Sequence, residues 1–175
     1  MESDPRDPVA RPDRPRTDVS GPVRLDATDR KILTLLQQDT TLPLDEMASR
    51  VGASRTPVWN RIRRMREQGV IRAQVALLDP EALGLEACFF VLIRTAEHDP
   101  DWAARFLTAV RARPEVVEAH RLAGDIDYLL KVQVRNARAY DRFYQALTAE
   151  VRVQSMTALL SMEQMKSTTA LPIEG

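Results

Sequence analysis

The run from Asp45 to Met65 constrains the fold of this chain more than any other part of its sequence. It places Ala48, Gly52 and Val58 at successive spacings of four and six residues. A small residue at the first position lets two helices cross closely, and glycine at the second can take the positive φ that a tight turn needs. The apolar residue at the third position packs back beneath the preceding helix. This spacing predicts a helix-turn-helix.

The surrounding pattern predicts three short helices that pack as one unit. We expect the first helix to begin after a cap at Asp26 or Thr28 and the second to end at Gly52. The third follows a cap at Ser54, with Pro57 in its first turn, where a missing amide hydrogen is harmless. Apolar residues three and four apart form the three buried stripes: Ile32, Leu33, Leu35 and Leu36; Leu44, Met47, Ala48 and Val51; Val58, Ile62 and Met65.

The outward side of the third helix carries side chains that suit a groove of DNA. Arginine can bind guanine and asparagine can bind adenine, each through paired hydrogen bonds, and the first residues of a recognition helix reach the base edges. The alternatives are a solvated helix face and, for Trp59, packing against a dimer partner. Arg61 lies nearer the buried stripe, where it either contacts phosphate or fixes the helix. The predicted DNA-binding residues are Ser54, Arg55, Thr56, Trp59, Asn60, Arg63 and Arg64.

Charge is distributed unevenly along the chain although the net charge is zero. Residues 25–72 carry six acidic and nine basic residues, a balance of +3. Residues 73–175 carry fourteen acidic and eleven basic residues, a balance of −3. A basic segment beside an acidic one is typical of a protein in which one module faces phosphate and the other does not.

We predict an α+β fold with four segments. Residues 1–22 hold five of the eleven prolines among charged residues and are expected to be a disordered tail. Residues 23–72 are expected to form the helix-turn-helix domain, 73–86 a linker strand, and 87–175 an αβ domain. In that last domain, strands over 87–95, 116–122, 128–134 and 153–165 alternate with helices over 99–113 and 136–150. The order βαββαβ predicts a ferredoxin-like sheet with both helices on one face. Their predicted apolar stripes are Trp102, Phe106, Leu107 and Val110, and Tyr140, Phe143, Tyr144 and Leu147.

A glycine turn with two carboxylates separates the second and third predicted strands. It reads Gly124-Asp125-Ile126-Asp127-Tyr128. One interpretation is a solvent-facing hairpin, because aspartate favours turns for backbone reasons alone. The other is an effector site, because a carboxylate beside backbone amides can hold both charged ends of an amino acid.

Four separated motifs resemble those of the Lrp/AsnC (feast/famine) regulators. They are LDATDRKIL, RIRRMREQGVI, GDIDYLLKV and a final MEQMK followed by LPI, and the resemblance covers residues 25–173. It implies a winged-helix-like helix-turn-helix domain joined to an αβ domain for effector binding and oligomerisation. The αβ domain would dimerise through its sheets, with amino-acid effectors bound between dimers. It also implies that Gly124, Asp125 and Asp127 lie at the effector pocket, bordered by His120. Many members of the family place hydroxyl residues on the last strand where this chain has Met156 and Ala158; Ser155 and Thr157 are one residue out of step.

The sequence disfavours an enzyme. Some relatives of this architecture decarboxylate haem precursors, but only His98 and His120 are available here, too few for a metal triad or for a nucleophile with its base. Cys88 lies in an apolar strand and fits packing. We therefore predict no catalytic residues, no metal and no cofactor.

The predicted function is sequence-specific regulation of transcription in response to a small molecule. The partners that we expect are double-stranded DNA with a palindromic operator, an amino-acid effector and a homodimer or larger homo-oligomer. No apolar run approaches the roughly 18 residues that a membrane span needs, so we expect no membrane partner and a cytoplasmic location. A nucleoid-type architectural protein that compacts DNA without a ligand remains the second hypothesis.

Overall fold

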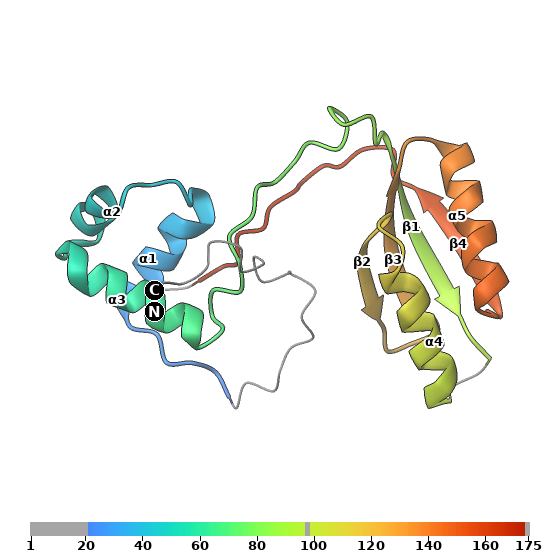
Figure 1. Ribbon diagram of the computed structural model, residues 1–175, viewed down its shortest axis with the longest axis horizontal. Coiled ribbons are helices and arrows are strands. Elements are labelled where there is room, and N and C mark those ends of the chain that lie inside the picture. Colours follow the sequence, from blue (N-terminus) through green and yellow to red (C-terminus); the bar gives the residue numbers. More distant parts are fainter. Residues whose placement is uncertain (1–20, 97–98, 174–175) are drawn as a thin grey trace, which may run out of the picture. The chain divides into compact units, whose positions relative to one another are not determined.

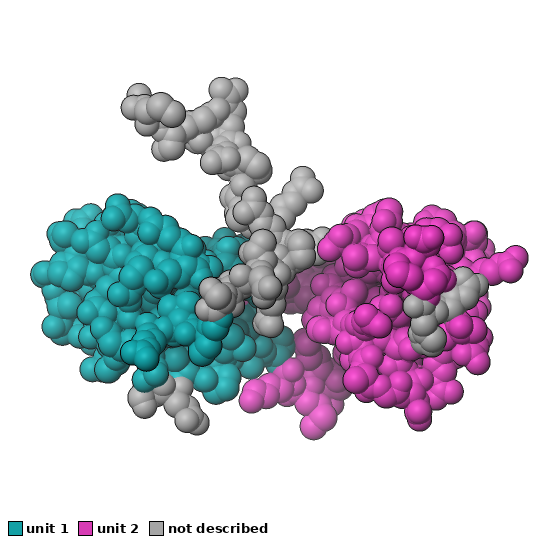
Figure 2. All heavy atoms as spheres, turned by 90° about the horizontal axis from the view of Figure 1, so that it is seen from below, with its two compact units in different colours: residues 1–76, 167–175 teal, residues 77–166 magenta. Residues whose placement is uncertain are grey.

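The computed structural model describes residues 21–96 and 99–173. These residues form two compact units, which Figure 2 shows in different colours. Unit 1 comprises residues up to Ala76 together with the C-terminal segment from Ser167, and unit 2 comprises Leu77–Lys166. Most of the predicted tail, residues 1–20, and His98 lie outside the described residues.

Unit 1 is built from three helices in the predicted places: α1 (Ala27–Gln38), α2 (Leu44–Val51) and α3 (Arg55–Glu67) (Figure 1). Asp26 caps α1 in a capping box: its Oδ1 accepts from the Asp29 backbone N at 2.8 Å, and its own backbone N donates to Asp29 Oδ2 at 3.2 Å. Gly52 ends α2 with a φ of +70°, as the turn requires.

The predicted side-chain cap at Ser54 is wrong. Ser54 precedes α3 with extended backbone, but its side chain makes no capping hydrogen bond. A capping oxygen normally accepts from the second or third amide of the helix, and the third residue of α3 is Pro57, which has no amide hydrogen. Proline at this position therefore removes one of the two donors that a serine cap uses.

The core of unit 1 is formed by the predicted stripes, of which Leu35, Leu36 and Leu44 are only partly buried. Its buried side chains are Ile32, Leu33, Met47, Ala48, Val51, Val58, Ile62 and Met65. The C-terminal segment also joins it, because Ile173 packs against this core. The Gln37 side-chain amide pairs with the Leu171 backbone, donating to its oxygen at 3.2 Å and accepting from its nitrogen at 2.6 Å. Residues 167–173 thus belong to unit 1, rather than to the αβ domain predicted over 87–175.

The predicted linker strand over 73–86 does not form. Residues 72–79 have no regular secondary structure, and turns follow from Pro80 to Gly84. A β-prone segment becomes a strand only where a neighbouring strand can accept its backbone hydrogen bonds. Between α3 and the first strand of unit 2, the structure therefore contains neither a linker strand nor a β wing.

Unit 2 is the predicted ferredoxin-like domain. Its four strands pair antiparallel in the order β2-β3-β1-β4. Side chains from both helices share one core with alternate residues of β1 and β3, so both helices cover the same face of the sheet. The elements are β1 (Ala87–Arg94), α4 (Pro100–Arg111), β2 (Val116–Arg121), β3 (Tyr128–Val134), α5 (Ala137–Glu150) and β4 (Ser155–Leu160).

The predicted apolar stripes of α4 and α5 are each too wide by one residue. Trp102 and Phe106 are buried and stack with their ring centroids 5.1 Å apart, but the neighbouring Leu107 is 43% exposed. On α5, Tyr144 is likewise exposed beside the buried Phe143. A helix turns about 100° per residue, so a side chain next to the centre of the buried stripe falls at its edge.

Candidate DNA-binding and effector-binding sites

The outer side of α3 is exposed as predicted. Its inward side chains, Val58, Ile62 and Met65, are buried in the core of unit 1. This burial orients the helix and leaves most of the residues between them exposed. All seven predicted DNA-binding residues are exposed: Ser54, Arg55, Thr56, Trp59, Asn60, Arg63 and Arg64.

Two of these arginines form weak surface ion pairs. Arg55 Nη1 lies 3.4 Å from Asp45 Oδ2, and Arg63 Nε lies 3.6 Å from Glu67 Oε1. Such solvent-exposed pairs contribute little to stability, roughly 0 to 1 kcal/mol. Both guanidinium groups can therefore exchange their carboxylate for a phosphate or a base at small cost.

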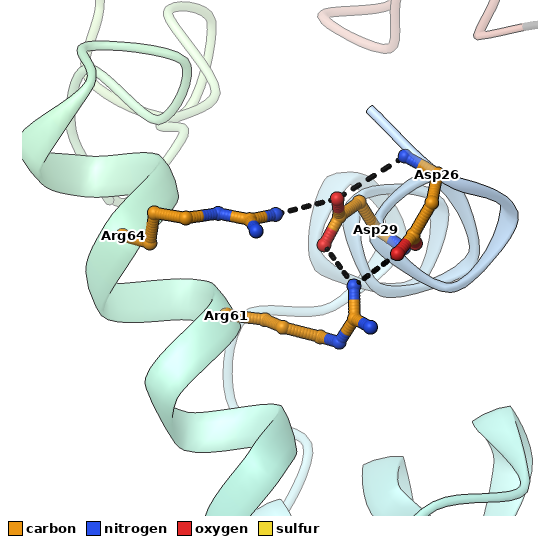
Figure 3. Close-up of polar contacts among 4 residues, drawn as sticks. All are labelled: Asp26, Asp29, Arg61 and Arg64. Atoms are coloured by element: carbon orange, nitrogen blue, oxygen red, sulfur yellow. Dashed lines mark hydrogen bonds and ion pairs between the residues drawn. The ribbon is translucent and has the colours of Figure 1, made fainter. Parts of the chain in front are cut away.

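A second group of charges joins α3 to α1 (Figure 3). Arg61 Nη1 donates to Asp26 Oδ2 at 2.6 Å and to Asp29 Oδ1 at 2.8 Å. Arg64 Nη2 donates to Asp29 Oδ2 at 2.5 Å. The hydrogen bonds to Asp26 and then to Asp29 raise the pKa of Arg61. Of the two roles predicted for Arg61, the structure supports fixing the helix.

Sequence reasoning missed Asp29 as a member of this group. Asp29 is 1% exposed, although it is the third residue of α1 and reads as an ordinary member of a capping box. Its burial depends on two arginines more than thirty positions away in the sequence. The local signal for this role was its position on α1: Asp29 lies on the same side of the helix as the buried Ile32 and Leu33.

The pKa of Asp26 is lowered by the hydrogen bond from the Asp29 backbone and by the bond from Arg61. A carboxylate with a lowered folded pKa stabilises the protein fully above its unfolded pKa of about 3.9, and this contribution is lost as the pH falls through the folded value. Asparagine also caps helices, so Asp26→Asn removes the charge and keeps a cap acceptor. We expect Asp26→Asn to lower the melting temperature at pH 7 and this difference to disappear toward pH 2. Thermal unfolding across this range measures it, and a difference independent of pH would contradict the prediction.

The predicted effector residues lie in and beside the turn between β2 and β3, but their roles differ. Asp127 Oδ2 accepts from the Thr95 backbone N at 2.8 Å, and the Asp127 backbone N donates to the Ile93 oxygen at 3.0 Å. Asp127 therefore ties the turn to the end of β1. Asp125 is exposed, and Gly124 beside it has a φ of +136°. Asp125 is thus the carboxylate of this turn that faces solvent.

His120 lies on β2, exposed, with its Nε2 3.4 Å from Glu118 Oε2. The same glutamate accepts from Lys131 Nζ at 3.1 Å. Burial raises the pKa of Cys88, which disfavours the thiolate and suits packing. Over residues 21–96 and 99–173, no three His, Cys, Asp or Glu side chains gather in a way that could hold a metal ion. No helix within the same ranges is long and apolar enough to cross a membrane.

A cavity of about 610 Å³ in unit 2 lies away from the predicted effector turn. It is bordered by the loop between α4 and β2, the end of β3 and one side of α5, including Arg113, Gln133 and Phe143. His120, Gly124, Asp125 and Asp127 are not among its lining residues. Of these four residues, His120, Gly124 and Asp125 are exposed and Asp127 is half-buried.

The sheet face that α4 and α5 leave uncovered is apolar at its centre. Phe90 on β1 lies opposite Leu159 on β4, and both are exposed. Leu92 on β1 lies opposite Leu129 on β3, and both are half-buried. Adjacent exposed apolar side chains of this kind mark a surface that a partner can cover.

A helix-turn-helix with an exposed arginine-rich third helix, joined to a separate ferredoxin-like domain, defines a two-domain DNA-binding regulator of transcription. The chain belongs to the Lrp/AsnC family of these regulators. Residues 25–66 match the AsnC-type helix-turn-helix domain, and residues 88–171 match the Lrp/AsnC ligand binding domain. The predicted family, fold class and general function are confirmed.

Relatives match along most of their length. The DNA-binding transcriptional activator DecR of Escherichia coli (strain K12) is 47% identical over 151 residues, which cover 86% of this chain and 99% of that protein. The crystal structure of an AsnC family transcriptional regulator from Agrobacterium tumefaciens has 48% identity and a TM-score of 0.82, covering 85% of this chain and 97% of that one. A transcriptional regulator from Neisseria meningitidis, solved as a complex with L-Met, has 32% identity and a TM-score of 0.81 over 85% of this chain and 97% of that one.

Proposed function

We propose that this regulator binds a palindromic double-stranded operator through α3 and changes its operator affinity when an amino acid binds at the turn between β2 and β3. The observation that carries this proposal is the exposed side of α3, where arginine and asparagine side chains stand on a helix held by a buried core. Those side chains have the hydrogen-bonding groups that read guanine and adenine in the major groove.

A homodimer is the smallest assembly that fits this function. Paired recognition helices match paired half-sites about one duplex turn apart, roughly 10 base pairs. The uncovered sheet face around Phe90 and Leu159 supplies an apolar surface on which two copies can pair. Larger assemblies of such dimers would bring a second chain to the open effector turn.

The effector proposal rests on the chemistry of the turn and on one relative. Asp125 is exposed and can pair with an ammonium group, while backbone amides of the turn can bond a carboxylate. The Neisseria meningitidis relative was solved with L-Met, an amino acid.

The proposal includes no catalytic role and a cytoplasmic site of action. His120 is exposed beside Glu118, and burial disfavours the thiolate of Cys88, so neither has the surroundings of a catalytic group. A regulator of this class meets its operator where the DNA lies, which in a bacterium is the cytoplasm.

Footprinting on the DNA upstream of the chain's own gene tests the proposal most directly. We expect protection of two half-sites and a preference of roughly a thousandfold or more over random duplex. An amino-acid panel should contain at least one member that changes the affinity by about 5- to 150-fold. Binding with little selectivity and no response to the panel would instead support an architectural protein.

Asp125→Ala should remove the response to the effector and leave operator affinity without effector unchanged. The reason is that Asp125 is exposed, so its loss removes a ligand contact and disturbs no core. Asp141→Ala is a matched control, since it deletes an exposed acid on α5 of the same unit. Titration of the effector into protein with labelled operator measures both properties. An intact response in Asp125→Ala would contradict the assignment of this turn.

A further inference from the structure

A buried carboxylate stands between α1 and the proposed recognition helix. Asp29 accepts hydrogen bonds at both oxygens: Oδ1 from Arg61, and Oδ2 from Arg64 and from the Asp26 backbone. Figure 3 shows the two arginines reaching from neighbouring turns of α3 toward the first turn of α1. Arg61 and Arg64 are three positions apart and therefore share one side of α3.

These hydrogen bonds add a directional restraint on α3 to the apolar packing of its buried side. A buried ionised carboxylate is costly unless charged and hydrogen-bonded partners surround it, so each bond to Asp29 resists displacement of the helix. The hydrophobic effect that drives apolar contacts between helices is non-directional. The contacts from Asp29 to both arginines thus restrain α3 relative to α1, in addition to the packing of its buried side chains.

The two arginines are held to different degrees. Arg61 bonds two carboxylates and its side chain is 29% exposed. Arg64 bonds Asp29 through one terminal nitrogen, and its side chain is 44% exposed. The guanidinium group has five N–H donors, so Arg64 can bond Asp29 and a phosphate at the same time. A side chain that is already oriented loses less conformational entropy when it binds.

We propose that Asp29 is a positioning residue for DNA binding, which anchors Arg61 as an internal support of α3 and orients Arg64 toward the DNA backbone. This inference rests on the proposed function, because it assumes that α3 meets DNA. It separates the two arginines by role: Arg61 supports the helix and Arg64 contacts phosphate.

The direction in which one substitution changes the operator affinity tests the inference. Asp29→Asn keeps the shape of the side chain and removes a negative charge. Charge alone predicts tighter DNA binding, because the protein becomes more positive. Positioning predicts the opposite, operator binding about tenfold weaker, with the dependence of log K on log salt reduced in slope by about one. Glu46→Gln is the matched control: it makes the same change of charge at an exposed pair with Arg50 on α2, and should not weaken binding.

The assays use the full chain, with circular dichroism and a melting curve showing that each variant is folded at the assay temperature. A folded Asp29→Asn protein with unchanged or tighter operator binding would overturn the inference and leave Asp29 with a purely structural role. If the Asp29→Asn variant does not fold, Arg64→Gln provides the test. The glutamine amide of this variant can still donate a hydrogen bond to Asp29. We expect Arg64→Gln to weaken binding and to reduce the salt slope by about one. An unchanged slope would overturn the inference.

The proposed function has its own, separate test in the wild-type chain. Wild-type protein that binds no duplex refutes the role of α3 itself, and the inference falls with it. Wild-type protein that binds its operator, together with an unaffected Arg64→Gln variant, refutes only the positioning role.

Discussion

Replacing Trp102 with alanine should lower the free energy of unfolding of unit 2 by about 3–5 kcal/mol. Trp102 is 1% exposed and stacks on Phe106, and its ring lies 5.8 Å from that of Tyr128. Its indole nitrogen also donates to the Arg152 backbone oxygen at 2.7 Å. The alanine variant would leave a large cavity and an unsatisfied carbonyl group, two costs that add.

Denaturant unfolding followed by far-UV circular dichroism measures this loss. Leu107→Ala is the control, since it shortens an apolar side chain on the same helix at an exposed position and should change the stability by less than about 1 kcal/mol. Similar effects of the two substitutions would mean that α4 does not pack through Trp102. Operator binding should survive Leu107→Ala unchanged.

The helices of this chain could be predicted because their determinants are local. Gly52 takes the positive φ that ends α2, and Asp26 forms the predicted cap with residues of its own helix. The strand order also followed from local patterns, because βαββαβ with two amphipathic helices leaves few arrangements. The prediction of a linker strand was wrong because a strand requires a neighbouring strand to pair with. Residues 72–79 pair with no strand in the described structure.

The contacts that the sequence did not reveal join residues far apart in the chain. Leu171 pairs with Gln37 across more than a hundred positions, and nothing local in the C-terminal segment indicates that it belongs to unit 1. In the sequence, Asp29 looks like an ordinary capping-box residue and Asp127 like an ordinary turn residue. Only the structure shows that Asp29 binds Arg64 and that Asp127 binds the Thr95 amide. Residue type and spacing identify candidate side chains, and long-range packing decides their roles.

The same distinction applies to the candidate sites. The exposed side of α3 followed from helical periodicity, because Val58, Ile62 and Met65 define the opposite side. The candidate effector site could be predicted less completely. Its turn could be recognised from Gly124 and the two aspartates, but Asp125 faces solvent and needs further groups to enclose a ligand.

Replacing both Arg55 and Asn60 with alanine should remove most of the preference for the operator over random DNA. Both side chains are exposed in the first turns of α3, where a recognition helix reaches base edges. Each paired hydrogen bond to a base contributes about 1–3 kcal/mol of discrimination, so the double variant should lose about 2–6 kcal/mol if the two contacts are independent. The fold should persist, because neither side chain belongs to the core of unit 1.

Competition between labelled operator and random duplex at fixed salt measures this discrimination, since binding to phosphate responds to salt and would otherwise mask it. Arg138→Ala on α5 is the control for charge, because it removes one exposed arginine from unit 2 and should leave the preference intact. The single variants Arg55→Ala and Asn60→Ala test whether each residue reads a base. Each should relax the choice of base at its own position in the half-site, so an equal loss of affinity for operator and random DNA would show that the two residues contact only the backbone.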